Sequence, residues 1–387
     1  MNKMKNANRL DEIKPSGIRR MFDRAQGIPG VISLGIGQPN IPTPQGLIDA
    51  LVKQVQNGDN YYSPTMGTSK YREAVAEQNR RDYDLEYDPK TEILATASGC
   101  EALYCALMSF IDPGDEVLIP DPSFLTYPRQ VMLAGGVPIW MKPTNELKID
   151  TSNLQEYISE KSKAIILNFP SNPTGEIMTR DELKPIIDLA VDNDLLILTD
   201  EVYEKCIFTD DRHIRVSKLD GAYERTLLLN SFSKTLCVPG WRIGYVAGPK
   251  DLVAPIVKMH SFVVANAPSA QQNAIGVFLN TEEADEFVKK LRNILKERML
   301  RIVKGFNSID GFACRQPEGS FYAYPNVSKH EDYTNSEEFA EKIFDKVKIA
   351  FVPGTEFGSS GEGYLRASFG SSSLDEIDEV ISRLKEL

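Results

Sequence analysis

Between residues 92 and 248 the sequence alternates short apolar runs with longer amphipathic stretches. The apolar runs lie at 92–96, 116–119, 164–167, 195–198, 226–229 and 244–247. Short runs without a polar face are typical of strands buried on both sides, and the longer stretches are typical of helices that connect them. The pattern therefore predicts an α/β fold whose mostly parallel sheet lies between helices. In such sheets, ligands bind just past the strand ends, so we expect functional residues there.

After residue 280 the pattern changes. A long amphipathic helix is expected from 281 to about 307, with Glu282 and Glu283 at its positive end. Short strand patterns then mix with helices, and Ser373 with Glu376 forms a capping-box signature. A chain of 387 residues has room for two domains. We expect a large domain at 46–279 and a smaller α+β domain built from 1–45 and 280–387.

Composition limits the partners of this chain. Its 44 basic and 55 acidic residues give a net charge of −11, which argues against a nucleic-acid surface. No apolar run approaches the roughly 18 residues that a membrane span needs, and the first residues lack the apolar core of a signal peptide. The five cysteines show no paired spacing and the three histidines are scattered, which argues against a metal centre. These features predict a soluble cytoplasmic protein with no nucleic-acid, membrane or metal partner.

One lysine stands where the run 226–229 ends. Lys234 lies between hydroxyl residues, with Ser231 and Ser233 before it and Arg242 eight positions after it. A lysine chosen at random is usually a solvated surface charge. At a strand exit, however, a lysine can be desolvated enough to act as an amine nucleophile and form a Schiff base. The serines and the arginine would then be donors for a nearby phosphate.

The stretch SFSKTLCVPGWRIG at 231–244 resembles the Schiff-base segment of the pyridoxal-phosphate-dependent aminotransferases of fold type I, the aspartate/aromatic aminotransferase family. The resemblance covers nearly the whole chain, because further motifs follow in the family's order. It implies a large domain with a mostly parallel, seven-stranded type of sheet and a smaller α+β domain. It also implies the cofactor pyridoxal 5'-phosphate, bound covalently to Lys234.

Two further motifs point to the phosphate of this cofactor. A strand exit turns directly into a helix at 98–103, where free N–H groups form an anion site. The resemblance places the phosphate on the backbone of Gly99, Cys100 and Glu101. The loop at 62–67 resembles a segment in which the family's tyrosine reaches the phosphate of the other subunit. If Tyr62 has this role, the protein is a homodimer with active sites at the subunit interface. The alternative interpretation of Tyr62 is simple loop packing.

Other motifs would surround the cofactor ring. Phe124 follows a proline and matches the residue that stacks on the ring, although core packing would also explain an aromatic there. Asn172, in an Asn-Pro-x-Gly segment, and Tyr203 match the partners of the ring oxygen. Asp200 ends a buried run, where a carboxylate is costly unless it meets a cation such as the ring nitrogen. The alternative for Asp200 is a helix N-cap.

Substrate contacts are expected from both ends of the chain. The Gly-x-Gly segment at 35–37 lacks the third glycine of a dinucleotide loop. It resembles instead the family segment whose second glycine, here Gly37, lies against the substrate carboxylate, with Asn172 nearby. Arg366 matches the arginine that forks onto that carboxylate, a geometry that lysine cannot reproduce. An ordinary charge on a strand face is the alternative for Arg366.

Together these features predict an aminotransferase with a ping-pong mechanism. Lys234, Asp200 and Tyr203 are the expected catalytic residues, with Lys234 as general base. An L-amino acid of the aspartate or aromatic type would pass its amino group to a 2-oxo acid such as 2-oxoglutarate. Residues around Arg19 and the loop at Tyr61 are candidates for recognising the side chain of the substrate. A β-lyase or related carbon–sulfur lyase on the same fold is the alternative, and a non-enzymatic sensor is less favoured because no basic domain is present.

Cys100 carries a separate hypothesis. A thiol at a helix N-terminus beside a phosphate site is expected to have a lowered pKa in the cofactor-free protein. This predicts faster alkylation without cofactor than with it. The alternative is an inert packing residue.

Overall fold

The computed structural model describes residues 5–11, 13, 15, 17, 21, 23–24 and 27–387. Its main feature is a seven-stranded sheet with the strand order β2-β8-β7-β6-β5-β3-β4. All neighbours pair in parallel except β8, which is antiparallel to both β2 and β7. The prediction of a mostly parallel sheet is therefore confirmed. The strands are β2 Ile93–Thr96, β3 Glu116–Pro120, β4 Val137–Met141, β5 Ser162–Asn168, β6 Leu196–Asp200, β7 Thr226–Ser231 and β8 Gly244–Ala247.

Strand β4 was not predicted from the sequence. It lies at the edge of the sheet and pairs only with β3. Four of its five residues are at least partly exposed, and it contains Pro138, which is tolerated at an edge but not in a central strand. It therefore lacks the fully apolar pattern that marks the central strands.

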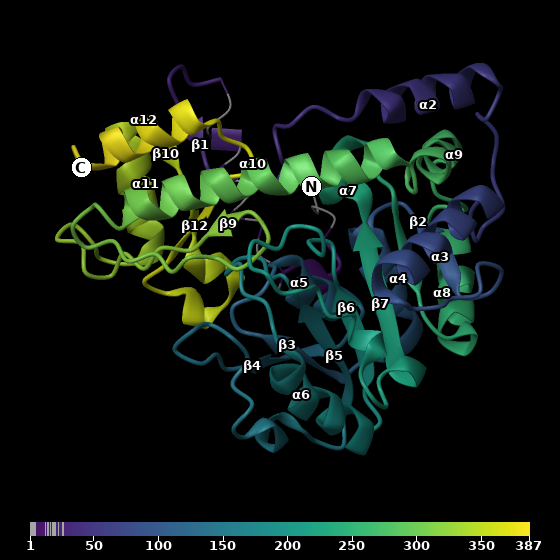
Figure 1. Cartoon of the computed structure of the whole chain (residues 1–387). Helices are drawn as coiled ribbons and strands as arrows, with labels where there is room; N and C mark the ends of the chain where they lie inside the picture. The colour runs from purple at the N-terminus through teal and green to yellow at the C-terminus, as the bar shows by residue number, and fades with distance from the viewer. Residues whose placement is uncertain are drawn as a thin grey trace.

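Helices cover both faces of this sheet (Figure 1). Alternate residues of β7 belong to different cores, since Leu227 and Leu229 pack with residues of α4 and α8 while Leu228 packs with residues of α3 and α9. Burial on both sides explains why the strands are apolar throughout. The helices of this part are α2 Gln45–Gln56, α3 Ser69–Tyr83, α4 Gly99–Phe110, α5 Thr126–Leu133, α6 Arg180–Asp192, α7 Phe232–Thr235, α8 Lys250–Val263 and α9 Ser269–Phe278.

A second layer of structure contains two small sheets. One has the order β11-β12-β9, and in the other β1 pairs in parallel with β10, which joins the beginning of the chain to its last third. The strands are β1 Ile32–Ser33, β9 Tyr322–Ala323, β10 Ile349–Ala350, β11 Val352–Pro353 and β12 Leu365–Ser368, and the helices are α10 Glu282–Phe306, α11 Ser336–Val347 and α12 Leu374–Leu384.

Helix α10 connects the two layers, and Figure 1 shows it running from α9 to the region of α11 and α12. Thr281 caps its first turn, and the expected capping box of Ser373 and Glu376 is present at α12. Short 3-10 helices occur at η1 Asn8–Leu10, η2 Leu154–Tyr157, η3 Val216–Lys218, η4 Tyr223–Arg225, η5 Pro239–Trp241, η6 Gly354–Phe357 and η7 Ser359–Gly361. Within the described part of the chain, no helix combines the length and apolar character that crossing a membrane requires.

Candidate active site

A cavity of about 580 Å³ lies at the carboxyl ends of the strands of the seven-stranded sheet. The loops that follow β2, β3, β5, β6 and β7 all contribute to it, as expected for ligand sites of open α/β sheets. Strands β9 and β12 close it from the second layer. The residues expected from the sequence that line this cavity are Gly37, Gly99, Cys100, Phe124, Asn172, Asp200, Tyr203, Ser231, Ser233, Lys234, Arg242 and Arg366.

Lys234 lies in the short helix α7, directly after β7, and is only partly exposed. Its Nζ donates a hydrogen bond to the carbonyl oxygen of Gly37. A Cβ atom at Gly37 would lie 2.3 Å from the hydroxyl oxygen of Tyr322, so a glycine is needed for the backbone to come this close. The amine of Lys234 is thus held in the middle of the cavity, between the two layers.

One end of the cavity is suited to an anion. Helix α4 begins at Gly99, and the Oγ atoms of Ser231 and Ser233 lie 2.8 Å apart beside its N-terminus. Arg242 is exposed at the rim of the same cavity. Strand β8 approaches this turn closely, because a Cβ on Gly244 would lie 3.1 Å from the backbone nitrogen of Gly99. Free N–H groups, hydroxyls and a guanidinium together form a phosphate-type site.

Asp200 ends strand β6 at the floor of the cavity and remains partly exposed to it. Its Oδ2 accepts a hydrogen bond of 2.8 Å from the Tyr127 hydroxyl, and its Oδ1 accepts one of 3.3 Å from the N–H of Val202. Burial raises the pKa of Asp200 to about 6, although these donors act against the shift. Both described partners are neutral, so this carboxylate is suited to a cationic ligand group.

Arg366 on β12 is almost fully buried, with 1% of its surface exposed. Its guanidinium donates 3.0 Å to Oδ1 of Asn172 and 2.7 Å to the carbonyl oxygen of Gly35. It lies against the rings of Tyr322 and Phe357, at 4.4 and 4.8 Å from their centroids. Burial lowers its pKa, and its Nε has no described hydrogen-bond partner. A buried guanidinium without a carboxylate partner is suited to an anionic substrate group.

Tyr203 and Phe124 also face the cavity. The hydroxyl of Tyr203 lies 2.9 Å from that of Tyr322, and burial raises the pKa of Tyr203. Phe124 is partly buried and packs edge-on against Tyr127, with 5.6 Å between the ring centroids. Tyr203 therefore bonds to a second tyrosine, a contact that the sequence did not indicate.

Two expected site residues do not line the cavity. Tyr62 is 89% exposed and points into solvent in the single chain. The side chain of Glu101 bonds to Ala97, Cys105 and His260, so only its backbone belongs to the turn beside the anion site. Arg19, the candidate for reading the substrate side chain, lies outside the described residues.

The expectation for Cys100 was wrong in direction. Its pKa is raised rather than lowered, first by burial and then by the Asp200 carboxylate, while Arg242 and Lys234 act in the opposite direction. The side chain is exposed toward the cavity although protein surrounds it on the other sides. Desolvation and a nearby carboxylate thus raise the pKa of this thiol, which argues against a reactive Cys100.

Among the cavity residues that sequence reasoning missed are two tyrosines. Tyr127 donates to Asp200, and Tyr322 lies against Arg366 and Gly37. Tyr127 lies in the first turn of α5 and its N–H donates to the carbonyl of Phe124, so the turn that leads into the helix brings the two aromatic residues together. Nothing local marks Tyr322, because it reaches the cavity only through the pairing of β9 with β12.

The fold and this cavity define a class of protein, namely an α/β enzyme with a lysine, an aspartate and an anion site around one ligand. The model of the family "Aminotransferase class I and II" matches residues 29–384. An aspartate aminotransferase of Pyrococcus abyssi is 36% identical over 98% of this chain and 97% of its own length. An aromatic-amino-acid aminotransferase of Thermococcus litoralis is also 36% identical, with the same coverage.

Solved structures give the same result. The N-succinyldiaminopimelate aminotransferase of Mycobacterium tuberculosis superimposes with a TM-score of 0.94 at 31% identity, covering 99% of this chain and 100% of that one. The chain therefore belongs to the class I and II aminotransferase family. It is an aminotransferase that depends on pyridoxal 5'-phosphate, and its fold is that of fold type I.

The residues of the cavity fit this cofactor. The anion site suits its phosphate, and the amine of Lys234 in the same cavity suits its aldehyde. Asp200, with a raised pKa and only neutral described partners, suits its ring nitrogen. Arg366 on β12 suits the carboxylate of a substrate, because it lines the same cavity and its Nε has no described partner.

Proposed function

We propose that this aminotransferase acts on L-amino acids of the aspartate or aromatic type and uses a 2-oxo acid such as 2-oxoglutarate as acceptor. The single observation that carries this is the arrangement of Lys234 in one cavity with Asp200 and the buried Arg366. The two relatives named above as aspartate and aromatic-amino-acid aminotransferases support both substrate types. In a ping-pong order, the first 2-oxo acid leaves before the second one binds.

Each residue has a proposed role. Arg366 and the backbone of Gly37 hold the substrate α-carboxylate, assisted by Asn172, which is already bonded to Arg366. When bound, the cofactor supplies an electron sink beside the substrate α-carbon. Lys234 Nζ would take the proton from that carbon as general base and deliver it to the cofactor carbon within the same half-reaction. Asp200 keeps the ring nitrogen protonated.

The remaining proposed contacts hold the cofactor in place. Tyr203 and Asn172 bond the ring oxygen and Phe124 covers the ring. The phosphate lies on the anion site, whose proposed donors are the backbone of Gly99, Cys100 and Glu101 together with Ser231, Ser233 and Arg242.

The exposed aromatic side chains support a homodimer. Tyr61 and Tyr62 are 83% and 89% exposed, and Phe262 at the end of α8 is 83% exposed. Large apolar side chains in such positions favour a protein interface. We propose that two chains associate through this region and that Tyr62 reaches the phosphate of the neighbouring site. A cytoplasmic location is part of this proposal.

We also propose a division of the chain into two domains. We place the large domain at 46–279 and the small domain at 1–45 with 280–387. The separate sheets and the parallel pairing of β1 with β10 support this division.

The test is an absorption titration of the purified protein with pyridoxal 5'-phosphate bound. Single amino acids are added in turn, followed by 2-oxoglutarate. Loss of the cofactor band on adding aspartate or an aromatic amino acid, with its return on adding 2-oxoglutarate, is the expected result. Release of pyruvate or ammonia with no return of the band would replace transamination by the lyase alternative. Lys234→Ala is the control and should show neither change.

A further inference from the structure

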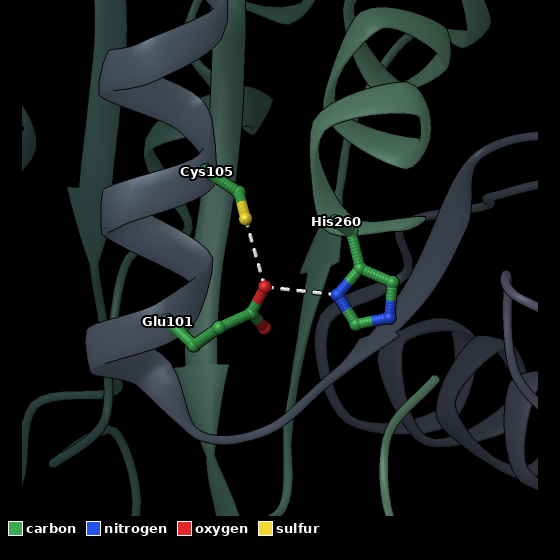
Figure 2. Close-up of side chains that lie close together, drawn as sticks. All are labelled: Glu101, Cys105 and His260. Atoms are coloured by element: carbon green, nitrogen blue, oxygen red, sulfur yellow. Dashed lines mark hydrogen bonds and ion pairs between the residues drawn. The ribbon is translucent and has the colours of Figure 1, made fainter. Parts of the chain in front are cut away.

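Glu101 connects four parts of the protein beside the anion site. Its Oε2 accepts a hydrogen bond of 3.0 Å from the N–H of Ala97, at the exit of β2. Its Oε1 accepts one of 2.8 Å from Cys105 Sγ and lies 2.8 Å from His260 Nδ1 (Figure 2). Glu101 and Cys105 lie one turn apart on α4, whereas His260 belongs to the last turn of α8. One carboxylate therefore ties the strand, two turns of α4 and helix α8 together.

The protonation of this cluster follows from its hydrogen bonds. The N–H of Ala97 and the thiol of Cys105 donate to the carboxylate of Glu101, and the N-terminus of α4 favours a negative charge there. His260 is fully buried, and its Nε2 has no described partner. A buried lone pair without a donor costs less than a buried N–H without an acceptor, so the proton of a neutral His260 belongs on Nδ1, facing Glu101.

The turn that Glu101 holds has an unusual backbone. Ser98 has φ of 103°, a conformation that residues other than glycine rarely adopt. Such a backbone persists only where its surroundings fix it. The bond from Ala97 to Glu101 fixes the residue before Ser98, and the carbonyl of Ser98 accepts from Ala102 after it. The strained turn is thus clamped on both sides, and this presents the first N–H groups of α4 to the cavity.

We propose that His260 and Glu101 are positioning residues for the phosphate of the cofactor. His260 holds the Glu101 carboxylate on the α8 side of α4, away from the anion site, by donating a hydrogen bond to it. Without this donor, the carboxylate loses its tether, the turn at Ser98 loses its clamp, and a carboxylate near the phosphate lacks one of its hydrogen bonds. All three effects weaken phosphate binding, so loss of the His260 donor should lower the affinity for the phosphate. This inference depends on the proposed position of the phosphate.

The test compares two ligands on the full-length protein freed of cofactor. Pyridoxal 5'-phosphate and pyridoxal, which lacks only the phosphate, are titrated by absorption, and the ratio of their affinities isolates the phosphate contribution. His260→Leu removes the donor at similar volume, and we expect the ratio to fall about tenfold, the value of one charge-assisted hydrogen bond. His260→Asn places an amide N–H close to the position of Nδ1, and it should restore the ratio to within about threefold of the wild type.

Loss of folding stability alone would weaken both ligands equally and leave the ratio unchanged. That result, or an equal fall of the ratio in His260→Asn and His260→Leu, would overturn the positioning role. If His260→Leu does not fold, His260→Met, which also lacks a donor, takes its place: an unchanged ratio overturns the positioning role and a lowered ratio supports it. Arg242→Gln serves as the reference, since it removes a proposed direct phosphate contact. Should Arg242→Gln also leave the ratio unchanged, the position of the phosphate itself is wrong, whereas a fall in Arg242→Gln alone rejects only the role of His260.

Discussion

The guanidinium of Arg366 donates a hydrogen bond of 3.0 Å to Oδ1 of Asn172, and this bond joins strand β12 to the loop after β5. The residue proposed for the substrate carboxylate is thereby fixed by a residue proposed for the cofactor ring. Because Arg366 also donates to the carbonyl of Gly35, two of its nitrogens are held by the protein before substrate binds. Preorganisation of this kind reduces the entropy lost on binding.

Arg366→Lys should therefore lower kcat/KM for amino acids by about 100-fold, since lysine offers a point charge in place of the fork and loses the bond to Asn172. Cofactor affinity, measured by absorption, should change little. Arg301→Lys is a matched control, because Arg301 is half exposed and its only ion pair among the described residues is with Asp378 at 3.5 Å. A variant Arg366→Lys with normal kcat/KM would contradict the assignment of the substrate carboxylate.

Asp200→Asn should stabilise the cofactor-free protein at high pH. Burial raises the folded pKa of Asp200 to about 6, above the value of about 3.9 in an unfolded chain. The folded state thus binds this proton more tightly, and the free energy of unfolding decreases as pH rises from about 4 to about 6. Asn carries no such cost, so the variant should exceed the wild type by about 1–3 kcal/mol at pH 8 and match it near pH 4.

Urea denaturation of both cofactor-free proteins across this pH range measures the effect. With cofactor bound, the Asp200→Asn variant should be less active than the wild type although it is more stable without cofactor. The ring nitrogen loses its anionic partner in the variant, so kcat should fall about 100-fold. Equal pH profiles for the two proteins would mean that Asp200 is not desolvated in the folded state.

Much of this site could be predicted because its chemistry lies at strand exits. Lys234 and Asp200 each follow an apolar run, and parallel strands bring such exits to one edge of the sheet. The sequence does not show in which direction a side chain points from the first turn of a helix. The side chain of Glu101 points toward α8 while its backbone borders the anion site, and only the packing of α4 on α8 determines this.

Long-range contacts account for the other omissions. Strand β4 is half exposed and carries Pro138, so it lacks the pattern of its neighbours. Arg215 is fully buried yet lies in a polar stretch, because its charge is compensated by Glu201 and Glu204 from the segment after β6. A buried charge becomes intelligible only when its partners are known.

Arg215→Met should be strongly destabilising. Burial acts to raise the pKa of Glu201, but His213 and Arg215 outweigh it and hold that pKa at about 2. Removal of Arg215 leaves buried carboxylates without this cation, which costs about 3–5 kcal/mol in the free energy of unfolding. Because Glu201 can then be protonated as pH falls, the penalty should be smaller at pH 5 than at pH 8.

Urea denaturation gives this free energy, and Asp378→Asn is the control. Asp378 and Arg301 are each 53% exposed, so loss of their ion pair should change stability by less than about 1 kcal/mol. A penalty for Arg215→Met as small as that of the control, or one that grows as pH falls, would show that the buried carboxylates do not depend on Arg215.

Tyr62→Phe tests whether the active site is shared between subunits. In the single chain Tyr62 is 89% exposed and outside the cavity, so an effect on the cofactor must come from a neighbouring chain. Loss of one hydroxyl bond to a phosphate should weaken pyridoxal 5'-phosphate about tenfold. The affinity is measured by absorption titration of the cofactor-free protein, and Tyr61→Phe, at the adjacent exposed tyrosine, is the control.

Mixed dimers then identify the subunit that supplies Tyr62. Suppose that each site takes its lysine from one chain and its tyrosine from the other. A mixed dimer of one Tyr62→Phe chain and one Lys234→Ala chain then has one intact site, and its other site carries both substitutions. Wild-type affinity should therefore return at the intact site. When wild-type chains are combined with chains that carry both substitutions, every site with Lys234 receives the altered residue 62, so affinity should stay low. The opposite pair of results would place Tyr62 in its own subunit's site, because a tyrosine acting within its chain always accompanies the lysine of that chain.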